Sequence, residues 1–282
     1  MRDFEIVHLG LPKTGSTSLQ KIWESDDRIE LHLKRRELQT YKWYSRKENT
    51  NHVYGKSLRI HSDETFLRTV NNNVKNEILF ERINKSIKNP KILLVIREPK
   101  SLLISRYRYG VLKGNISVEF EKWLQSEDGT DFIGLCNFSN LYKSLTHHFD
   151  RSKIKILCFE DLKADYLTFY NDVYEYLELS SPENLTNLHE NTKSLSSSEL
   201  KQKMYLNKIL PGYPHFNRTR NYNYLNKVLL KIVKMKKSSN FNLHIDWEDS
   251  IFLKEVCEEL RFSNRSFEEN SGIKINQKGY DI

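Results

Sequence analysis

Cysteine is scarce in this chain. The three cysteines, Cys136, Cys158 and Cys257, are spread over 282 residues. They are too few and too scattered for a disulfide framework or a zinc site. Cys158 lies in an apolar strand pattern, where a buried and inert thiol is the usual role. We therefore expect a protein of a reducing compartment, the cytoplasm.

Long apolar runs are also missing. No run in the sequence approaches the roughly 20 residues needed to span a bilayer. The first apolar strand pattern begins so soon after Met1 that no room is left for a signal peptide or a membrane anchor. These two absences predict a soluble chain.

The chain lacks a stretch rich in proline, glycine or serine that would act as a linker, and no internal repeat is apparent. Length alone allows one or two domains, so the missing linker favours a single domain over residues 1–282. The net charge is +8, from 45 Lys+Arg against 37 Asp+Glu. Such a charge favours anionic partners, such as a phosphorylated cofactor, acidic glycans, nucleic acid or a membrane surface.

The most informative feature present is the segment 4–18. It consists of an apolar strand, Phe4–Leu9, a loop bounded by Gly10 and Gly15, and a hydroxyl-rich helix start. Unpaired N–H groups and the helix dipole make such a start an anion site. A nucleoside-triphosphate loop would carry lysine directly after the second glycine. Here Ser16 takes that position and the lysine, Lys13, lies inside the loop.

A second motif begins with Lys91–Ile96, an apolar and branched run that is typical of a parallel strand buried on both faces. Pro99 suits the first turn of a following helix. Arg97 would then lie at the carboxyl end of the strand, and Ser105 two turns along the helix. An arginine can bind a phosphate with two hydrogen bonds, although Arg97 alone would equally suit a surface salt bridge.

Strand and helix patterns alternate along the chain, which favours an α/β fold with helices on both faces of a parallel sheet. The predicted strands are 4–9, 28–33, 54–61, 91–96 and 153–159. The predicted helices are 15–24, one from about Ser62 with Ser62 or Asp63 as N-cap, 73–89, and an amphipathic helix through 167–177. Ligands bind at the carboxyl ends of such strands, where Lys13 and Arg97 both fall.

The segment Pro12–Thr17 resembles the 5′-phosphosulfate-binding loop of sulfotransferases that use 3′-phosphoadenylyl sulfate (PAPS), whose usual form is P-K-[TS]-G-[TS]-[TS]. Arg97 and Ser105 resemble the pair that holds the 3′-phosphate in that family, and Phe159–Leu162 recurs there after a late strand. The resemblance runs from about residue 4 to 210, and it leaves a helical, basic extension over about 211–282. It implies a three-layer sandwich of the P-loop nucleoside-triphosphate-hydrolase type.

The resemblance also implies residue roles. It assigns the cofactor to Pro12, Lys13, Thr14, Gly15, Ser16, Thr17, Ser18, Arg97 and Ser105. Lys13 would neutralise charge on the leaving nucleotide, a role that is electrostatic. The family works without a metal, so none is expected in the reaction.

The acceptor hydroxyl needs a general base. The segment 58–65 resembles an S-D-E turn of bacterial sulfotransferases that share the G-L-P-K-T-G loop, which favours Glu64 first and His61 second. A competing site lies at Glu30 and His32, where animal glycan sulfotransferases carry their base. Glu64 could instead serve only the helix dipole, and His61 only a backbone hydrogen bond. His8 fits a core or sheet-edge histidine.

Three further segments have open interpretations. In 191–195, Lys193 or Ser194 could contact the cofactor, or the segment could be a polar loop. The basic, aromatic segment 211–220 could close over a phosphate or a glycan, or form an ordinary surface loop. Lysines in 227–237 repeat at i, i+4 and i+7, which suits either a solvated helix face or a membrane-surface contact.

These interpretations predict a sulfotransferase that moves a sulfuryl group from PAPS to an alcohol oxygen. Relatives with the G-L-P-K-T-G loop favour a hydroxyl of a polysaccharide or glycolipid, and a small alcohol or a lipid stays open. The rival hypotheses are a P-loop kinase of a small metabolite and a non-catalytic basic protein. Nucleic acid is not an expected partner of the sulfotransferase.

Overall fold

The computed structural model describes residues 3–33, 57–64, 66–67, 73–183, 185, 195–209, 228 and 250–282. The chain divides into two compact units, which are described separately. The first consists of Met1–Pro99, Gly134–Glu190 and Leu260–Ile282, and the second of Lys100–Ile133 and Asn191–Glu259. The predicted single domain stays a prediction.

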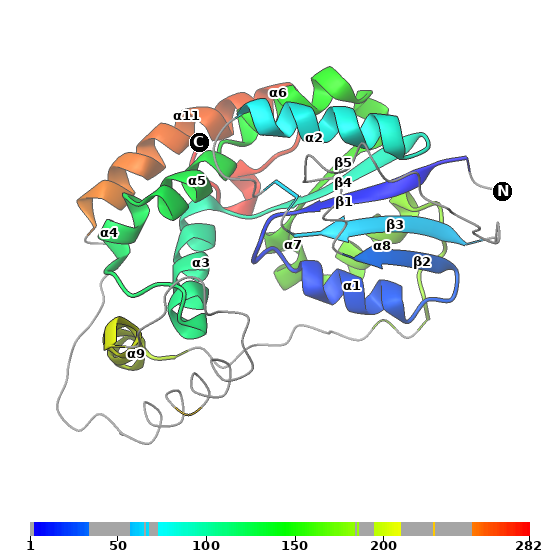
Figure 1. Ribbon diagram of the computed structural model, residues 1–282. Helices are drawn as coiled ribbons and strands as arrows, with labels where there is room; N and C mark the ends of the chain where they lie inside the picture. The colour runs from blue at the N-terminus through cyan, green and yellow to red at the C-terminus, as the bar shows by residue number, and fades with distance from the viewer. Residues whose placement is uncertain are drawn as a thin grey trace. The chain divides into compact units, whose positions relative to one another are not determined.

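The first unit contains a sheet of parallel strands in the order β2-β3-β1-β4-β5 (Figure 1). Its strands are β1 (Glu5–Gly10), β2 (Ile29–Leu33), β3 (Leu58–Asp63), β4 (Pro90–Ile96) and β5 (Ile154–Cys158). The inner strands β1 and β4 are buried over nearly their whole length, as strands with helices on both faces must be. Because all five strands run parallel, their carboxyl ends lie along one side of the sheet.

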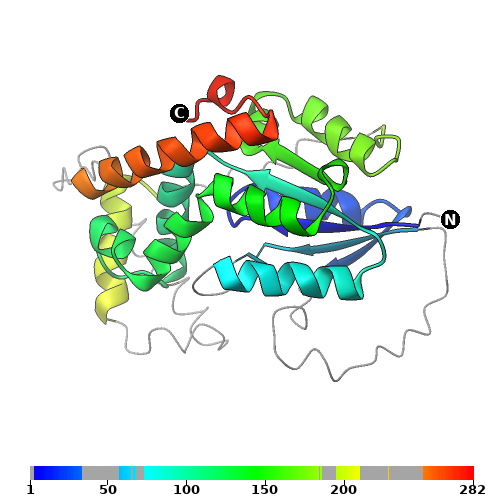
Figure 2. The same ribbon diagram turned by 90° about the horizontal axis from the view of Figure 1, so that it is seen from above.

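Helices cover both faces of this sheet. One face carries α1 (Ser16–Glu24), α7 (Phe159–Ala164) and α8 (Tyr166–Tyr176), whose apolar residues form one core cluster with the strands. The other face carries α2 (Asn73–Ser86) and α6 (Phe138–His148), which pack side by side (Figures 1 and 2). The predicted three-layer α/β sandwich is confirmed.

Local sequence explains how α1 docks on the sheet. Leu19, Ile22 and Trp23 recur at helical spacing and are all buried against the strands. A helix buries its apolar face by projecting residues that are three or four apart in the same direction. The helix that follows the loop is therefore held firmly, and its first turn has a defined position at the end of β1.

One predicted boundary is wrong. Ser62 and Asp63 do not cap a helix, because β3 continues through both of them. Ser62 pairs with His8 of β1, and Asp63 pairs with Leu9. Cross-strand pairing on β3 outweighs the capping preference of a serine or aspartate. The next helix, α2, begins only at Asn73.

The second unit is helical in its described residues. It contains α4 (Phe120–Leu124), α9 (Ser197–Ile209), most of α3 (Pro99–Lys113) and α5 (Glu127–Leu135), and the first part of α11 (Ile251–Ser271). Its core holds a polar contact, because the fully buried Lys203 donates a hydrogen bond to Asn207. Burial lowers the pKa of Lys203 to about 8. The Asn207 amide in turn donates to the Val111 and Ile116 carbonyls at 2.9 and 2.8 Å.

Several predicted features lie outside the described residues. They are Lys193 and Ser194, the segment 211–220 and, apart from Val228, the segment 227–237. Within the described part of the chain, none of the helices has both the length and the apolar character needed to cross a bilayer.

Candidate active site

The loop between β1 and α1 has a constrained backbone. Lys13 and Gly15 both have positive φ, at 72° and 86°. The Thr14 hydroxyl donates to the Leu11 carbonyl at 2.6 Å, which ties the loop to itself. A non-glycine residue at positive φ is uncommon and is held there by surrounding contacts. The loop therefore presents Lys13 in one defined backbone conformation.

Both loop glycines lie close against neighbouring residues. A Cβ on Gly15 would lie 2.7 Å from Cδ2 of Leu162, and its left-handed backbone also favours glycine. A Cβ on Gly10 would lie 2.7 Å from the Ser16 hydroxyl and 3.0 Å from Cα of Glu64. Glycine at these two positions lets the loop pack against α7 on one side and the end of β3 on the other.

The hydroxyl residues of the loop differ in burial. Thr14 and Ser18 are buried, and Thr17 is exposed. The Ser16 hydroxyl is buried without a hydrogen-bond partner among the described residues. A buried polar atom of this kind calls for a ligand or water, and it lies at the helix start, where N–H groups favour an anion. Ser16 is thus the loop hydroxyl best suited to a phosphate or sulfate oxygen.

Arg97 follows directly after β4 and reaches the loop. Its Nη1 donates to the Lys13 carbonyl at 3.0 Å, and its guanidinium carbon lies 4.7 Å from the centroid of the Phe159 ring. Nε of Arg97 is buried without a hydrogen-bond partner among the described residues. Burial lowers the pKa of Arg97, although the nearby Glu160 and Glu98 act in the opposite direction. The structure therefore joins the two sequence motifs at one place.

A second cation at this place escaped the sequence analysis. Nζ of Lys163, on α7, lies 5.0 Å from the centroid of the same Phe159 ring. Burial lowers the pKa of Lys163, and repulsion from Arg97 lowers it further. Two cations that repel each other in a partly buried place favour the binding of an anion. The signal was available, because Lys163 comes directly after the Phe159–Leu162 motif.

The C-terminal segment supports this arrangement. The Glu98 N–H donates to Oε1 of Glu160 at 3.1 Å, and the Tyr280 hydroxyl donates to Oε2 at 2.9 Å. Lys278 forms an ion pair with Asp161. Burial raises the pKa of Tyr280, which keeps its hydroxyl a donor. Tyr280 thus helps to position the strand end that carries Arg97, a role with no local sequence signal.

Glu64, the first choice as general base, lies beside the loop. It follows β3 directly, it is exposed, and its Cα lies 3.0 Å from the position that a Gly10 Cβ would take. An exposed carboxylate at the carboxyl end of the sheet can reach an acceptor that approaches the loop. Its role as base stays a prediction.

His61, the second choice, belongs to a different cluster. Its Nε2 hydrogen-bonds to Oε2 of Glu5 at 2.6 Å, at the start of β1, and its ring stacks on His32 at a centroid distance of 5.1 Å. Burial raises the pKa of Glu5, but the hydrogen bond and charge of His61 and the charge of Arg59 outweigh it and lower the pKa. The His61 side chain is therefore held by Glu5, at the amino-terminal end of β1.

The competing site at Glu30 and His32 is part of the same cluster. Glu30 pairs with Arg59 at 3.1 Å and with His32 at 3.0 Å. Burial raises the pKa of Glu30, and the hydrogen bond from Arg59 and the charge of His32 reverse this into a net lowering. A carboxylate with a lowered pKa is a weaker proton acceptor, so this pair is less suited to the role of base.

The two remaining predicted residues are His8 and Ser105. His8 is fully buried, and burial lowers its pKa to about 3, which confirms it as a core histidine. Its Nδ1 lies 2.8 Å from the Ser62 hydroxyl, which also accepts from Gln20. Ser105 lies half-buried on α3, in the second unit. Its contact with a 3′-phosphate stays a prediction.

Known proteins resemble the chain in sequence and in fold. The sequence model of the sulfotransferase domain matches residues 3–231. Luciferin sulfotransferase of Photinus pyralis is 24% identical over 225 residues, which are 73% of this chain and 59% of that protein. The chain thus spans less than two thirds of that relative's length.

A solved structure shares the fold of this chain. A sulfotransferase from Alicyclobacillus acidocaldarius has a TM-score of 0.52 at 15% identity, covering 67% of this chain and 87% of its own. A sulfotransferase domain from the curacin biosynthetic pathway has a TM-score of 0.48 at 13% identity, covering 92% and 98%. The first likeness confirms the predicted fold, which sulfotransferases share with P-loop hydrolases. Because the sequence match extends over most of its length, the chain belongs to the sulfotransferase family.

Proposed function

We propose that this chain transfers a sulfuryl group from PAPS to an alcohol oxygen. The observation that carries the proposal is the hydrogen bond from Arg97 to the Lys13 carbonyl. It brings the predicted 3′-phosphate arginine to the predicted 5′-phosphosulfate loop. A nucleotide that carries an anionic group at each end of its ribose suits such a pair of anion sites.

The residues of the described chain fit this donor. The start of α1 and the unpartnered Ser16 hydroxyl suit the phosphosulfate. The buried Nε of Arg97 and the ammonium of Lys163 suit a second phosphate. The kinase alternative lacks support here, because Ser16 stands where a P-loop kinase carries lysine.

When bound, PAPS supplies an activated sulfuryl group whose S–O bond to the nucleotide breaks as the acceptor oxygen bonds to sulfur. Lys13 and the N–H groups from Thr14 to Thr17 stabilise negative charge on the departing phosphate oxygen. Glu64 accepts the proton of the acceptor hydroxyl. The products are then a sulfate ester and adenosine 3′,5′-bisphosphate, and Glu64 returns its proton to water.

We further propose a carbohydrate hydroxyl as the acceptor, from a polysaccharide or glycolipid, and the cytoplasm as the place of reaction. The acceptor rests on the resemblance of the G-L-P-K-T-G loop to that of bacterial enzymes, and the location on the low cysteine content. A small alcohol or a lipid is the alternative acceptor that the same chemistry would serve.

The first experiment measures binding of adenosine 3′,5′-bisphosphate by calorimetry in the presence of a chelator. We expect metal-independent binding that Arg97→Ala weakens. Binding of ATP that requires magnesium would support the kinase instead. Strongly salt-dependent binding of polyanions that Lys13→Ala leaves intact would support the non-catalytic basic protein.

The second experiment identifies the acceptor. The chain is incubated with PAPS labelled in its sulfuryl group and with a panel of glycans, small alcohols and lipids. We expect the label to appear in a glycan. The labelled product should stay intact under mild conditions that hydrolyse the nucleotide donor. Label in a small alcohol or a lipid alone would overturn the carbohydrate assignment and keep the sulfotransferase.

A further inference from the structure

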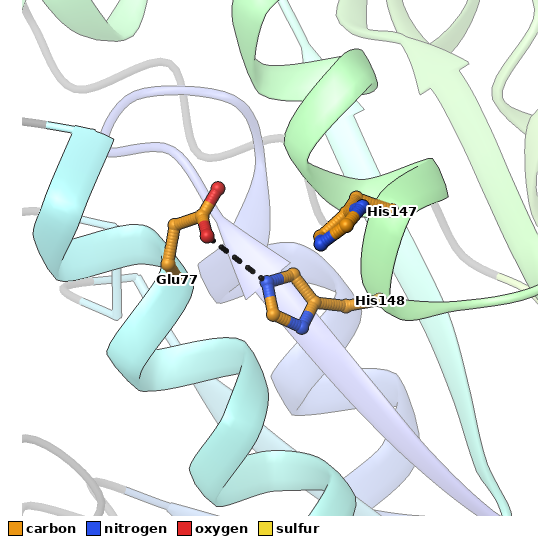
Figure 3. Close-up of side chains that lie close together, drawn as sticks. All are labelled: Glu77, His147 and His148. Atoms are coloured by element: carbon orange, nitrogen blue, oxygen red, sulfur yellow. Dashed lines mark ion pairs between the residues drawn. The ribbon is translucent and has the colours of Figure 1, made fainter.

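A histidine and carboxylate cluster lies away from the loop, on the sheet face covered by α2 and α6. Glu77 projects from α2 toward His147 and His148 at the end of α6 (Figure 3). The ligand atoms that the three side chains offer lie within 4.8 Å of one another. This cluster has no part in the proposed sulfuryl transfer.

The cluster is organised by its surroundings. Glu77, Phe80 and Asn84 recur at i, i+3 and i+7 on α2, so they lie on one face of that helix. The Asn84 amide donates to the His148 carbonyl at 2.9 Å. The buried Phe80 ring packs edge-on against the His148 ring at a centroid distance of 5.7 Å. Both contacts hold the end of α6 against the face of α2 that carries Glu77.

The His148 side chain has an unmet hydrogen-bonding need. Its Nε2 is buried and has no hydrogen-bond partner among the described residues. Oε2 of Glu77 lies 3.6 Å away, which is beyond hydrogen-bond range. The two atoms point toward each other in Figure 3. This separation leaves room for an ion that binds both atoms at once.

We propose that Glu77, His147 and His148 form a binding site for a divalent transition metal of the zinc type. Two imidazole nitrogens and one carboxylate oxygen are ligands that Zn²⁺ accepts at about 2.0–2.2 Å. His147 is exposed and 48% of the Glu77 side chain is exposed, so both can rotate inward to contract the cluster. Water would complete the coordination on the open side.

The site has a structural consequence. A metal that binds Glu77 and both histidines would cross-link α2 to the end of α6, two elements that are distant in sequence. Binding to the folded chain alone stabilises it against unfolding. Because imidazole ligands must be unprotonated to bind a metal, affinity should fall in acid. The proposal holds whether or not the proposed sulfuryl transfer is correct.

The test titrates Zn²⁺ into the tag-free full chain by calorimetry, after treatment with a chelator. We expect one ion per chain and a rise in the melting temperature that the chelator reverses. Loss of one of three ligands should weaken binding by about tenfold or more, so His147→Ala and Glu77→Gln should each do so. Both side chains are at the surface, which keeps the fold intact.

Glu81→Gln is the matched control. Glu81 lies one turn beyond Glu77 on α2 and pairs with Lys85 at 3.6 Å, so its removal should leave zinc affinity unchanged. Substitution of Co²⁺ should add visible absorption bands that His147→Ala removes. Zinc binding that survives both His147→Ala and Glu77→Gln, or a wild-type chain that does not bind zinc, would overturn the proposal.

Discussion

Charge is arranged differently at the two ends of the sheet in the first unit. At the carboxyl ends, Arg97 and Lys163 lie over one Phe159 ring, and the pKa of each is lowered, first by burial. Toward the strand starts, Glu5 is engaged by His61 and Arg59. Its pKa is lowered because these partners outweigh burial.

This contrast indicates which end of the sheet needs a ligand. The cluster at the strand starts satisfies its own charges with side chains, as buried charges must. The cation pair at the carboxyl ends keeps the buried Nε of Arg97 without a partner in the described chain. An anion would complete it. This contrast also favours Glu64, beside the loop, over His61 as the general base.

The largest effect is expected from Lys13→Ala. Loss of a group that stabilises charge in the transition state should lower turnover by about 10³-fold. Alanine also has a Cβ, so the positive φ of this position costs no more than in the natural chain. Turnover is measured as sulfuryl transfer to the acceptor that labelling identifies, and folding by circular dichroism. Lys85→Ala on α2 is the control and should keep full turnover.

Variants of Glu64 and His61 test which end of the sheet holds the general base. Glu64→Gln should lower turnover by about 10²-fold and leave nucleotide affinity unchanged, because only proton transfer is lost. His61→Leu should chiefly lower stability, because it leaves Glu5 partly buried without its nearest donor. Turnover, nucleotide affinity and urea unfolding are measured for both variants. The reverse pattern would assign the base to the strand starts.

The cation pair can be tested by nucleotide affinity. Arg97→Ala should weaken adenosine 3′,5′-bisphosphate binding by about tenfold to a hundredfold, since a hydrogen bond to a charged group contributes about 1.5–3 kcal/mol. Lys163→Met should have a smaller effect of the same sign. Lys153→Met, near the start of β5 and paired with Asp150 at 3.9 Å, is the control and should bind normally. Equal affinity in all three variants would contradict an anion site at Phe159.

The pH dependence of stability should distinguish a buried neutral group from a paired carboxylate. The pKa of His8 is lowered from 6.5 to about 3, so between these values the unfolded chain binds the extra proton. Stability should therefore fall as pH drops below 6.5, by at most about 1.4 kcal/mol per pH unit from this residue. The lowered pKa of Glu5 acts in a lower window, since its stabilising effect is complete above 4.5 and is lost as pH falls through its folded value.

Urea unfolding of the natural chain and of His8→Asn at pH 7, 6 and 5 measures this slope. The variant is expected to be less stable at pH 7, because it disturbs the contact with Ser62. Its stability should nevertheless change less steeply with pH. Parallel pH profiles for the two proteins would show that His8 does not stay neutral in the folded state.

The smallest effect is expected at the C-terminal support. Tyr280→Phe removes the hydroxyl that donates to Glu160, which should cost about 1 kcal/mol of stability. We expect a loss of nucleotide affinity smaller than that of Arg97→Ala, because Tyr280 acts only through Glu160 and the Glu98 N–H. The exposed Tyr205 offers the control, Tyr205→Phe, which should change neither stability nor affinity.

Much of the fold could be predicted because its elements have local signals. The apolar run of β4 and the spacing of Leu19, Ile22 and Trp23 follow from side-chain periodicity alone. The end of β3 could not be predicted in this way. Ser62 and Asp63 are typical caps, and only their pairing with β1 makes them strand residues.

The candidate site divides in the same manner. The loop and Arg97 have motifs, and Lys163 directly follows one. Tyr280, in contrast, reaches the site only through packing between segments far apart in the chain. Sequence placed His61 and Glu64 together, because they are three positions apart. The structure separates them, since the side chain of His61 is engaged by Glu5 and Glu64 lies beside Gly10.

The sequence by itself determined the family and the α/β class, and it predicted a phosphosulfate-binding loop, because glycine spacing and apolar periodicity act over a few residues. The tertiary structure alone decided which charges are paired and which await a ligand. That outcome depends on burial and on distances between segments such as β4, α7 and the C-terminal residues. Neither quantity is encoded in any short stretch of the chain.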